Sequence, residues 1–555
     1  MVIAAPALEA RKGKGLKGGA LGLASATVIG VASTAPAYSL AATVGLIAAI
    51  AGVYSPAIIV VAFVPMLLTA CAYYYLNRVD PDCGATFSWV TRAMGPHAGW
   101  MGGWGVVIAD IVVMPSLAWV AAFYTYSLLG LDSLAESTWA LLLLGSAFIL
   151  VLTLITWLGI ELSARTQFVL LATEIVLLIG FSIYALINVY ATHPAGSITP
   201  SWQWINPFNL TASELSAGVL VALFIYWGWD TAANVNEETR GRTKAGVATI
   251  LSTLVLVGTY VVAAFATTAY RGPGFLSDNP DDVLTAMARS PWSKLMMLAI
   301  LSSAIASTQT TILPTARTTL SMAAHRALPK ALAKISPKYL TPTWSTWWMG
   351  IASIAWWLLL IAIDRTENIL WDSITGLGFA IAFYYAITAL AAPILFRRLL
   401  FKSFKNFLLV GVAPIIGALT LGWVFVRSAI DSFFYSPDTA FTPAWFQFGS
   451  FRGLGAPFVI GIGMLVLGIP LMLWRKHVVP AFFHTRRDVA SSMVEVLPDE
   501  FRVTDATLQM GALPTPATTK DPAGSFASER TVADNQRADV GHDPHARRDR
   551  PRGSG

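Results

Sequence analysis

Two interruptions in long apolar segments contain the residues of this sequence that are best suited to binding chemistry. The first reads Val31-Ala-Ser-Thr-Ala-Pro-Ala-Tyr38, and the second reads Phe224-Ile-Tyr-Trp-Gly-Trp-Asp230. A helix in hydrocarbon must satisfy its backbone N–H and C=O groups internally, so a break is tolerated only beside protein or a protein-lined cavity. Paired breaks, one early in each half of a chain, are typical of the substrate site of a secondary transporter.

The first interruption is suited to binding an anion and an amine together. Pro36 lacks an N–H and clashes with the preceding turn, so we predict one half-helix ending near Ala32 and another beginning near Ala35. The second half-helix would offer the N–H groups of about Ser33 to Ala35 to a carboxylate. Carbonyls freed from the first half-helix would accept an ammonium group. The alternative is a kink repaired by the Ser33 and Thr34 hydroxyls.

The second interruption combines a glycine with several rings. Gly228 permits backbone conformations that other residues rarely adopt. Helical spacing cannot bring all four neighbouring rings into one pocket, and we expect Phe224 to be an apolar or cation–π gate. Each ring has packing or anchoring at the membrane interface as its alternative role. The predicted substrate-binding residues are Ala32, Ser33, Thr34, Ala35, Pro36, Tyr38, Phe224, Ile225, Tyr226, Trp227 and Gly228.

Three acids lie in apolar segments: Asp110, Glu174 and Asp230. A charge at mid-bilayer costs about 2.5–3.5 kcal/mol, and no Lys or Arg lies at a comparable depth to offset it. Their partner would be a proton, a metal cation or a cationic substrate. A lone buried carboxylate favours its protonated form, so we predict Glu174 and Asp110 as coupling or proton-carrying groups. A structural hydrogen bond between helices is the alternative for both.

The elements that carry these residues are membrane helices. Of 555 residues, 55% are hydrophobic and 12% are charged, against about 25% charged in a soluble domain. We predict an all-α polytopic membrane protein with 12 transmembrane helices, each of roughly 20 residues or more. Their ranges are 22–51, 56–76, 98–129, 138–158, 166–190, 212–236, 245–269, 291–322, 344–363, 371–396, 404–426 and 455–474.

Basic residues sort by predicted loop. Lys14, Arg92, Arg240 and Lys330 are among the many on one side, whereas the other side has few, such as Arg271. An excess of Lys and Arg marks the cytoplasmic side, so we expect a multi-pass protein of the plasma (inner) membrane with both termini cytoplasmic. The net charge of +6 therefore needs no nucleic-acid partner. The tail over 488–555 has too few apolar residues to fold alone, and it is either a solvated tail or a regulatory one.

Three short motifs, in order along the chain, carry a family resemblance. They are Leu162-Ser-Ala-Arg165, the second interruption with Asn236-Glu237-Glu238, and the segment from Arg317 to Lys330 followed by Thr341-Pro342. Together they resemble the amino acid–polyamine–organocation (APC) permeases. The resemblance implies a five-plus-five inverted repeat of the leucine-transporter type over 22–396, with helices 1 and 6 broken. Residues 1–21 would precede this core, and 397–487 would form two peripheral helices with a cytoplasmic end.

The resemblance also assigns roles and reveals departures. Proton-coupled members carry a lysine where this chain has Glu174, and many members carry Gly-[Ser/Thr]-Gly where it has Ala32-Ser-Thr. Because side chains replace these glycines, it is in question whether the backbone here binds the substrate carboxylate as it does in those members. Asp230 matches an acidic position that supports the break. Sodium-coupled relatives bind the ion through hydroxyls at the positions of Ser307 and Thr308, although such hydroxyls also join membrane helices.

Glu237 and Glu238 follow the second interruption, close to Arg240 in the sequence. We expect them at the inner membrane edge, as a solvated helix end. A cytoplasmic gate network is the alternative.

These features predict a secondary active transporter that moves an amino acid or related amine by alternating access, with uptake coupled to protons. Its partners would be a small-molecule substrate, a proton or sodium ion, and the lipid bilayer. No nucleotide-binding GxxxxGK[ST] motif, catalytic set or cofactor motif stands out, so we expect neither an enzyme nor a cofactor. One alternative is a carrier of a polyamine, another organic amine or potassium. Another is a membrane ligand sensor without transport.

Overall fold

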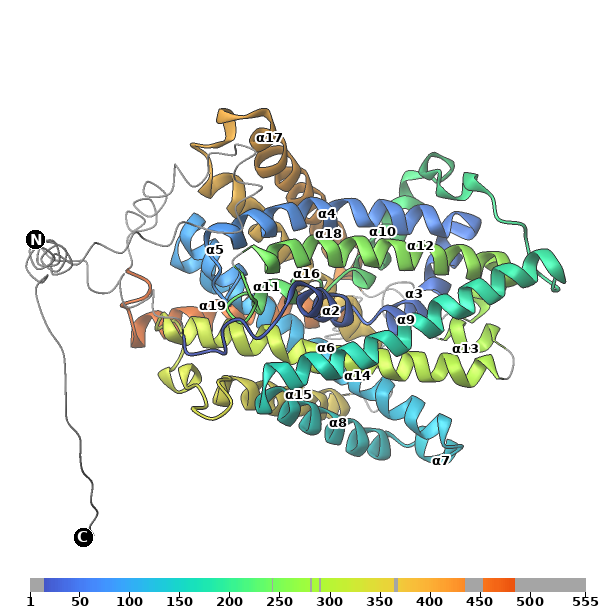
Figure 1. The fold of residues 1–555 in the computed structure, drawn as a ribbon, viewed down its shortest axis with the longest axis horizontal. Helices are drawn as coiled ribbons and strands as arrows, with labels where there is room; N and C mark the ends of the chain where they lie inside the picture. The colour runs from blue at the N-terminus through green and yellow to red at the C-terminus, as the bar shows by residue number, and fades with distance from the viewer. Residues whose placement is uncertain are drawn as a thin grey trace, which may run out of the picture. The chain divides into compact units, whose positions relative to one another are not determined.

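The computed structural model describes residues 14–241, 243–279, 282–288, 291–363, 368–434 and 453–484. Within these ranges the chain is helical, with three isolated β-bridges and no longer strand. Figure 1 shows the arrangement as a ribbon. The predicted tail over 488–555 lies outside the described residues, as do residues 1–13 of the predicted N-terminal segment.

The described helices follow the predicted segments closely. In the first half they are α2 (Leu23–Ser33), α3 (Pro36–Ala51), η1 (Gly52–Tyr54), α4 (Ser55–Val79), α5 (Thr86–Met94), α6 (Pro96–Leu128), α7 (Asp132–Ala135), α8 (Thr138–Leu158) and α9 (Ile160–Ala191). Then follow η2 (Trp202–Ile205), η3 (Pro207–Asn209), α10 (Ala212–Ile225), α11 (Thr231–Asn234), α12 (Lys244–Asp278), α13 (Val283–Met287), α14 (Trp292–Ala324), η4 (Lys330–Ala333), α15 (Thr343–Ile363) and α16 (Asn368–Leu395). The last are η5 (Leu400–Lys402), α17 (Phe404–Asn406), the π-helical η6 (Phe407–Val412), α18 (Ala413–Phe433) and α19 (Ala456–Val478).

Among the described residues, ten helical stretches are long and apolar enough to cross a membrane. One of them, Leu23–Val79, contains α2, α3 and α4, and the shorter apolar α10 is additional. The chain is therefore an all-helical, multi-pass membrane protein. Several helices are longer than predicted; for example, α9 begins directly after Gly159, and α12 continues across a kink at Gly272, where φ is 76°.

Helices α6 and α14 form the interior of the bundle. Their most apolar stretches are 89% and 72% buried, against 39% for both α8 and α15. Small residues let these two interior helices approach each other closely: a Cβ at Gly103 of α6 would lie 2.9 Å from the Met322 sulfur of α14. Large apolar side chains on the outer helices are exposed instead, among them Leu143 and Val176. Such a surface suits contact with lipid.

The segment before α2 returns to the end of the second interruption. The Leu21 amide donates to the Glu238 carbonyl at 3.0 Å, and the Arg240 amide donates to the Leu21 carbonyl at 2.7 Å. Helix α2 also packs against α9, α12 and α14. Figure 1 shows α4 and α12, which pack together, as long neighbouring rods. These contacts bring the two interruptions, far apart in the sequence, to one place inside the bundle.

Candidate functional site

The first interruption separates α2 from α3. Helix α2 ends at Ser33 and α3 begins at Pro36, one residue from each predicted limit. Ala35 between them has a φ of 48°, an uncommon conformation for a residue other than glycine. The Thr34 hydroxyl donates to the Val31 carbonyl at 2.7 Å, and the Ser39 hydroxyl donates to the Thr34 carbonyl at 2.6 Å. Side chains therefore satisfy part of the freed backbone.

The amides assigned to a carboxylate are not free in this structure, and that part of the prediction is wrong. The Thr34 amide donates to the Val31 carbonyl at 3.1 Å, and the Ala35 amide donates to the Ala32 carbonyl at 3.2 Å. The physical reason is that the last turn of α2 tightens into bonds spanning three residues, which use up these donors. The first turn of α3, from Pro36 onward, is the remaining place where an anion would meet backbone donors.

The second interruption covers the residues between α10 and α11. Gly228 has a φ of 114°, which favours glycine. Its amide donates to the Tyr385 hydroxyl of α16 at 3.3 Å, and that hydroxyl donates to the Asp230 carboxylate at 2.7 Å. The Trp227 indole N–H donates to the Tyr384 hydroxyl at 2.6 Å. Two adjacent tyrosines of α16 thus form hydrogen bonds with the residues of the interruption, and Asp230 is part of this network.

The two interruptions touch each other. The Ser33 and Thr231 hydroxyl oxygens are 2.9 Å apart, and a Cβ at Gly228 would lie 2.7 Å from the Ser33 carbonyl oxygen. The Tyr260 hydroxyl of α12 donates to the carbonyl of Ile225 at 2.6 Å. All of these residues are buried. The breaks therefore form one shared structure in the bundle interior.

The aromatic residues of the second interruption point in different directions. Phe224 is half-buried and contacts Tyr38 edge-on, with ring centroids 6.4 Å apart. Tyr226 donates its hydroxyl to the Ile59 carbonyl of α4 at 3.1 Å. Trp229 stacks on Tyr385 with centroids 5.2 Å apart. Packing thus accounts for Tyr226 and Trp229, while Tyr38 and Phe224 bring the two broken helices together.

The three predicted acids are all buried, but their surroundings differ. Asp110 accepts a hydrogen bond of 2.6 Å from the Thr315 hydroxyl, and Asp230 accepts one from Tyr385. Glu174 is 0% exposed, and neither of its carboxylate oxygens forms a hydrogen bond with any described residue. Polar groups near it include the Ser303 hydroxyl, the Ala37 backbone and the Tyr260 hydroxyl. None of the three acids forms an ion pair with a Lys or Arg in the described ranges.

The hydroxyls of α14 connect this helix to the first interruption. The Ser307 hydroxyl donates to the Ser33 carbonyl at 3.0 Å, and the Ser303 hydroxyl accepts from the Tyr38 amide at 3.2 Å. Thr308 donates within its own helix to the Ala304 carbonyl at 2.7 Å. The contacts of Ser303 and Ser307 join helices, whereas that of Thr308 does not. A cation site at Ser307 and Thr308 stays a prediction.

A cluster that sequence reasoning missed closes one end of the bundle. We name it the Lys14 cluster: Lys14, Asp82 and Glu237. The Lys14 ammonium pairs with the Asp82 carboxylate at 2.8 Å and with Glu237. Asp82 also accepts hydrogen bonds of 2.7 Å from the hydroxyls of Ser88 and Ser321. Three segments of the chain, before α2, after α4 and after α11, are thereby tied together.

The expectation of a solvated helix end at Glu237 and Glu238 is wrong. Glu238 is fully buried and forms a two-fold ion pair with the equally buried Arg317, at 2.9 and 3.0 Å. Glu237 belongs to the Lys14 cluster and also accepts from the Cys83 amide at 2.9 Å. The partners come from α14 and from the N-terminal segment, not from the neighbouring Arg240. The local sequence could not identify these distant partners. The presence of two acids in a loop otherwise rich in basic residues did indicate that ion pairs form there.

Electrostatics within the Lys14 cluster favour its charged form. Burial raises the pKa of Asp82, but the Lys14 ammonium, His325 and the hydrogen bonds outweigh burial and hold that pKa well below its ordinary value. Burial lowers the pKa of Lys14, but Asp82 and then Cys83 and Glu237 raise it above its ordinary value. Asp82, Cys83 and Glu237 also have the spacing of metal ligands. The Lys14 ammonium already contacts both carboxylates and offsets their charge.

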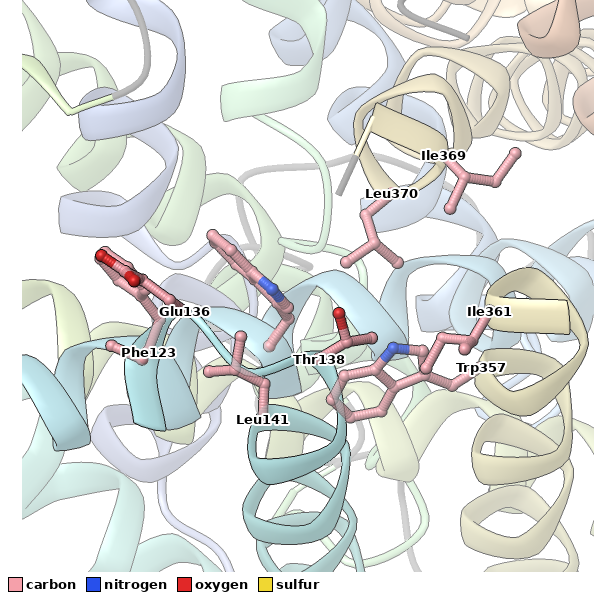
Figure 2. A pocket seen from close by; sticks show the side chains of 10 residues that line it. Phe123, Glu136, Thr138, Leu141, Trp357, Ile361, Ile369 and Leu370 are labelled. Carbon is pink, nitrogen blue, oxygen red and sulfur yellow. The ribbon is translucent and has the colours of Figure 1, made fainter. Parts of the chain in front are cut away.

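A cavity of about 430 Å³ lies elsewhere in the bundle (Figure 2). Its walls come from α6, α7, α8, α15 and α16 and consist of Trp119, Phe123, Ala135, Glu136, Thr138, Leu141, Trp357, Ile361, Ile369 and Leu370. None of the predicted site residues lines it. The cavity is therefore separate from the two interruptions.

Comparison with known proteins places the chain in a family. The model of the amino acid permease family matches residues 21–446. An uncharacterized transporter of Mycobacterium tuberculosis is 26% identical over 67% of this chain and 79% of its own length. The low-affinity putrescine importer PlaP of Escherichia coli is 21% identical over 73% of this chain and 88% of its own length. The branched-chain amino acid permease BcaP of Bacillus subtilis is 24% identical over 53% of this chain and 65% of its own length.

These matches agree with the three motifs that resemble APC permeases, and they indicate a transporter rather than an enzyme. The chain belongs to the amino acid permease family of membrane transporters.

Proposed function

We propose that this permease is a secondary active carrier that takes up an amino acid or related amine by alternating access, coupled to protons. The contact between the two interruptions, at Ser33, Gly228 and Thr231, is the observation that carries the proposal. Broken helices expose backbone dipoles in the bundle interior, where they bind solutes without a full charge on the protein. A pair of breaks turned toward lipid would have left those dipoles unsatisfied.

The proposal includes twelve transmembrane helices with a five-plus-five inverted repeat of the leucine-transporter type. Taking α2 and α3 as the first helix and α10 and α11 as the sixth gives each half a broken first helix. Helices α4, α6, α8 and α9 complete one half, and α12, α14, α15 and α16 complete the other. The contacts of α18 and α19 with α16 support a peripheral position for the last two helices.

The proposed orientation has both termini in the cytoplasm of a cell with this protein in its plasma membrane. Lys14, Lys17 and Arg92 occupy the end of the bundle where α2 begins and α4 ends. In that orientation the Lys14 cluster and the Arg317–Glu238 pair close the cytoplasmic side. Alternating access then requires these ion pairs to separate whenever the site opens inward.

Glu174 is the proposed coupling residue. Its carboxylate is buried without a hydrogen bond or ion pair among the described residues, so the charged form is costly where it lies. A proton offsets that cost directly. A carrier that binds substrate together with a proton at Glu174 would move both in one cycle.

Uptake into proteoliposomes tests the function. Radiolabelled amino acids and amines are offered under an imposed pH gradient, with and without sodium. We expect accumulation that depends on the pH gradient and not on sodium. In Glu174→Gln we expect substrate binding to remain and the response to the gradient to disappear. Accumulation that follows sodium, or an unchanged pH response in this variant, would contradict the coupling mechanism.

A second candidate is transport of an organic amine without a carboxylate, or of potassium. The buried acids Asp110, Glu174 and Asp230 favour it because no described Lys or Arg forms an ion pair with them. Among the relatives, the putrescine importer supports it and the branched-chain permease supports an amino acid.

A further inference from the structure

The cavity between α6, α7, α8, α15 and α16 takes no part in the proposed carrier mechanism (Figure 2). Its volume is about 430 Å³, and small-molecule sites in proteins have volumes of about 300–1,000 Å³. Protein interiors are closely packed and contain few voids larger than a water molecule. A space of this size therefore has the dimensions of a ligand site.

Residues on single faces of three helices build the walls of the cavity. Trp119 and Phe123 are neighbours on one face of α6, and Trp357 and Ile361 are neighbours on one face of α15. Trp357 is 1% exposed and Leu141 of α8 is 4% exposed, so these walls lie within the bundle. The cavity is thus an interior space lined mainly by rings and aliphatic side chains.

The aromatic walls are held in place by the protein itself. The Trp119 and Phe123 rings stack with their centroids 5.2 Å apart. On the other side, a Cβ at Gly145 of α8 would lie 2.5 Å from the Trp357 ring, so this ring packs directly on the α8 backbone. Rings fixed in advance cost a ligand little ordering free energy when it binds. The site is therefore largely formed before any ligand enters.

The described wall of the cavity includes one charged side chain, and it is acidic. Glu136 follows the short helix α7 and is exposed, so it marks the mouth of the cavity. Its carboxylate forms no ion pair or hydrogen bond within the described ranges, and no described Lys or Arg lines the cavity. Figure 2 shows Glu136 and Phe123 on the same side of the space, and α6 packs against α7. A cation at the mouth would meet a carboxylate and an aromatic ring together.

We propose that this cavity is a second binding site, separate from the two interruptions, for a small amphiphilic organic cation such as an arylalkyl ammonium ion. Its apolar body would be buried among the rings and aliphatic side chains, and its ammonium group would lie at Glu136. An anionic ligand would find no described cationic partner there. The inference does not rest on the proposed transport function.

Ligands of one size and different charge test the ligand class. Phenylbutylamine, phenylbutanol and phenylbutyrate are titrated calorimetrically into the full-length protein in lipid nanodiscs, with empty nanodiscs as the reference for partitioning into lipid. We expect the amine to bind at least about fivefold more tightly than the alcohol, and the butyrate to bind most weakly. An alcohol that binds as tightly as the amine would indicate a purely apolar site, such as one for a lipid chain, and would overturn the inference.

Two pairs of variants test the place of binding. Leu141→Trp fills the cavity from α8, so we expect the amine to bind at least about tenfold more weakly. Leu143→Trp adds the same ring on the exposed face of α8 and should leave binding unchanged. Glu136→Gln should lower the preference for amine over alcohol at least about threefold. Asp132→Asn alters an exposed acid of α7 that is not part of the cavity wall and should keep the preference.

Two outcomes would overturn the assignment. Undiminished amine binding in Leu141→Trp would mean that the amine binds elsewhere, for example at the interruptions. An unchanged preference in Glu136→Gln would mean that this carboxylate does not bind the ammonium group. If Leu141→Trp does not fold, Glu136→Gln at the mouth of the cavity still decides.

Discussion

At the scale of single residues, the junction between the two interruptions depends on one glycine. Gly228 combines a φ of 114° with a backbone so close to Ser33 that any Cβ would lie 2.7 Å from the carbonyl oxygen. Both features exclude a larger residue for independent reasons, one conformational and one steric. A substitution at Gly228 therefore tests how closely the two broken helices must approach each other.

We predict that Gly228→Ala destabilises the protein by about 1–3 kcal/mol and abolishes uptake, because it strains the backbone and pushes the two breaks apart. Thermal unfolding of the purified protein in detergent, together with uptake, measures both effects. The control is Gly258→Ala in α12, where nothing lies within 4 Å of the added Cβ. Equal unfolding temperatures for the two variants would contradict the proposed junction.

The Tyr385 hydroxyl offers a second test at this scale. It accepts from the Gly228 amide and donates to Asp230, so Tyr385→Phe leaves two buried polar groups without this partner. We expect a loss of about 1–3 kcal/mol in the free energy of unfolding and reduced uptake. Tyr190→Phe, on the exposed surface of α9, is the matched control. A loss no larger than that of the control would show that Tyr385 does not support the break.

At the scale of elements, the Lys14 cluster ties the segment before α2 to the ends of α4 and α11. Lys14 pairs with residues 68 and 223 positions away in the sequence. Cys83, between the two acids of the cluster, is fully buried beneath these contacts. The rate at which a reagent modifies the Cys83 thiol therefore measures how often this end of the bundle opens.

We predict that Lys14→Met increases the rate at which a hydrophilic maleimide modifies Cys83 by about tenfold, equivalent to about 1.4 kcal/mol of lost closing free energy. The measurement uses a Cys71→Ser background, because Cys71 is the other free cysteine of the chain. Lys17→Met removes an exposed ion pair with Glu161 and should leave the rate unchanged. Equal labelling in Lys14→Met and Lys17→Met would mean that the cluster does not hold this end closed.

At the scale of the whole molecule, the buried charges are of two kinds. The Lys14 cluster and the Arg317–Glu238 pair combine opposite charges, whereas Asp110, Glu174 and Asp230 are acids without a paired cation in the described ranges. Paired charges hold an end closed, and an unpaired acid attracts a cation or proton. In the proposed alternating-access mechanism, the paired charges would close one end and the unpaired acids would belong to the site.

The pH dependence of transport should come from the unpaired acid. Lys14 and His325 hold the pKa of Asp82 low against the effect of burial. The stability that this side chain contributes is therefore lost only as pH falls below about 4, the ordinary pKa of an aspartate. The pKa of Lys14 is raised by Asp82, Cys83 and Glu237 against burial, so its contribution is lost only as pH rises above about 10. Between about pH 5 and 8 the pair stays charged.

We therefore predict that the pH profile of uptake between about pH 5 and 8 keeps its shape in Lys14→Met and flattens in Glu174→Gln. Initial uptake rates at fixed substrate concentration, measured across this range, provide the comparison. The unaltered protein at each pH is the reference. A profile that flattens in Lys14→Met and persists in Glu174→Gln would transfer the titrating role to the Lys14 cluster.

The sequence alone determined the helices and the places where two of them break. Apolar length marks a membrane helix, Pro36 lacks the N–H that would continue one, and Gly228 permits the turn in the other; all are local properties. The observed limits of α2 and α3 lie within one residue of those predicted. The three buried acids were also evident, because a charge within an apolar run stands out.

Tertiary structure alone decided which groups meet. Whether the amides of the first interruption are free depends on how α2 closes its last turn and on what α9 and α14 place beside α3. The same holds for Glu237 and Glu238, whose partners Lys14 and Arg317 lie in distant segments. Backbone breaks follow from covalent chemistry within a few residues, whereas the identity of a charge's neighbour follows from packing of the whole bundle.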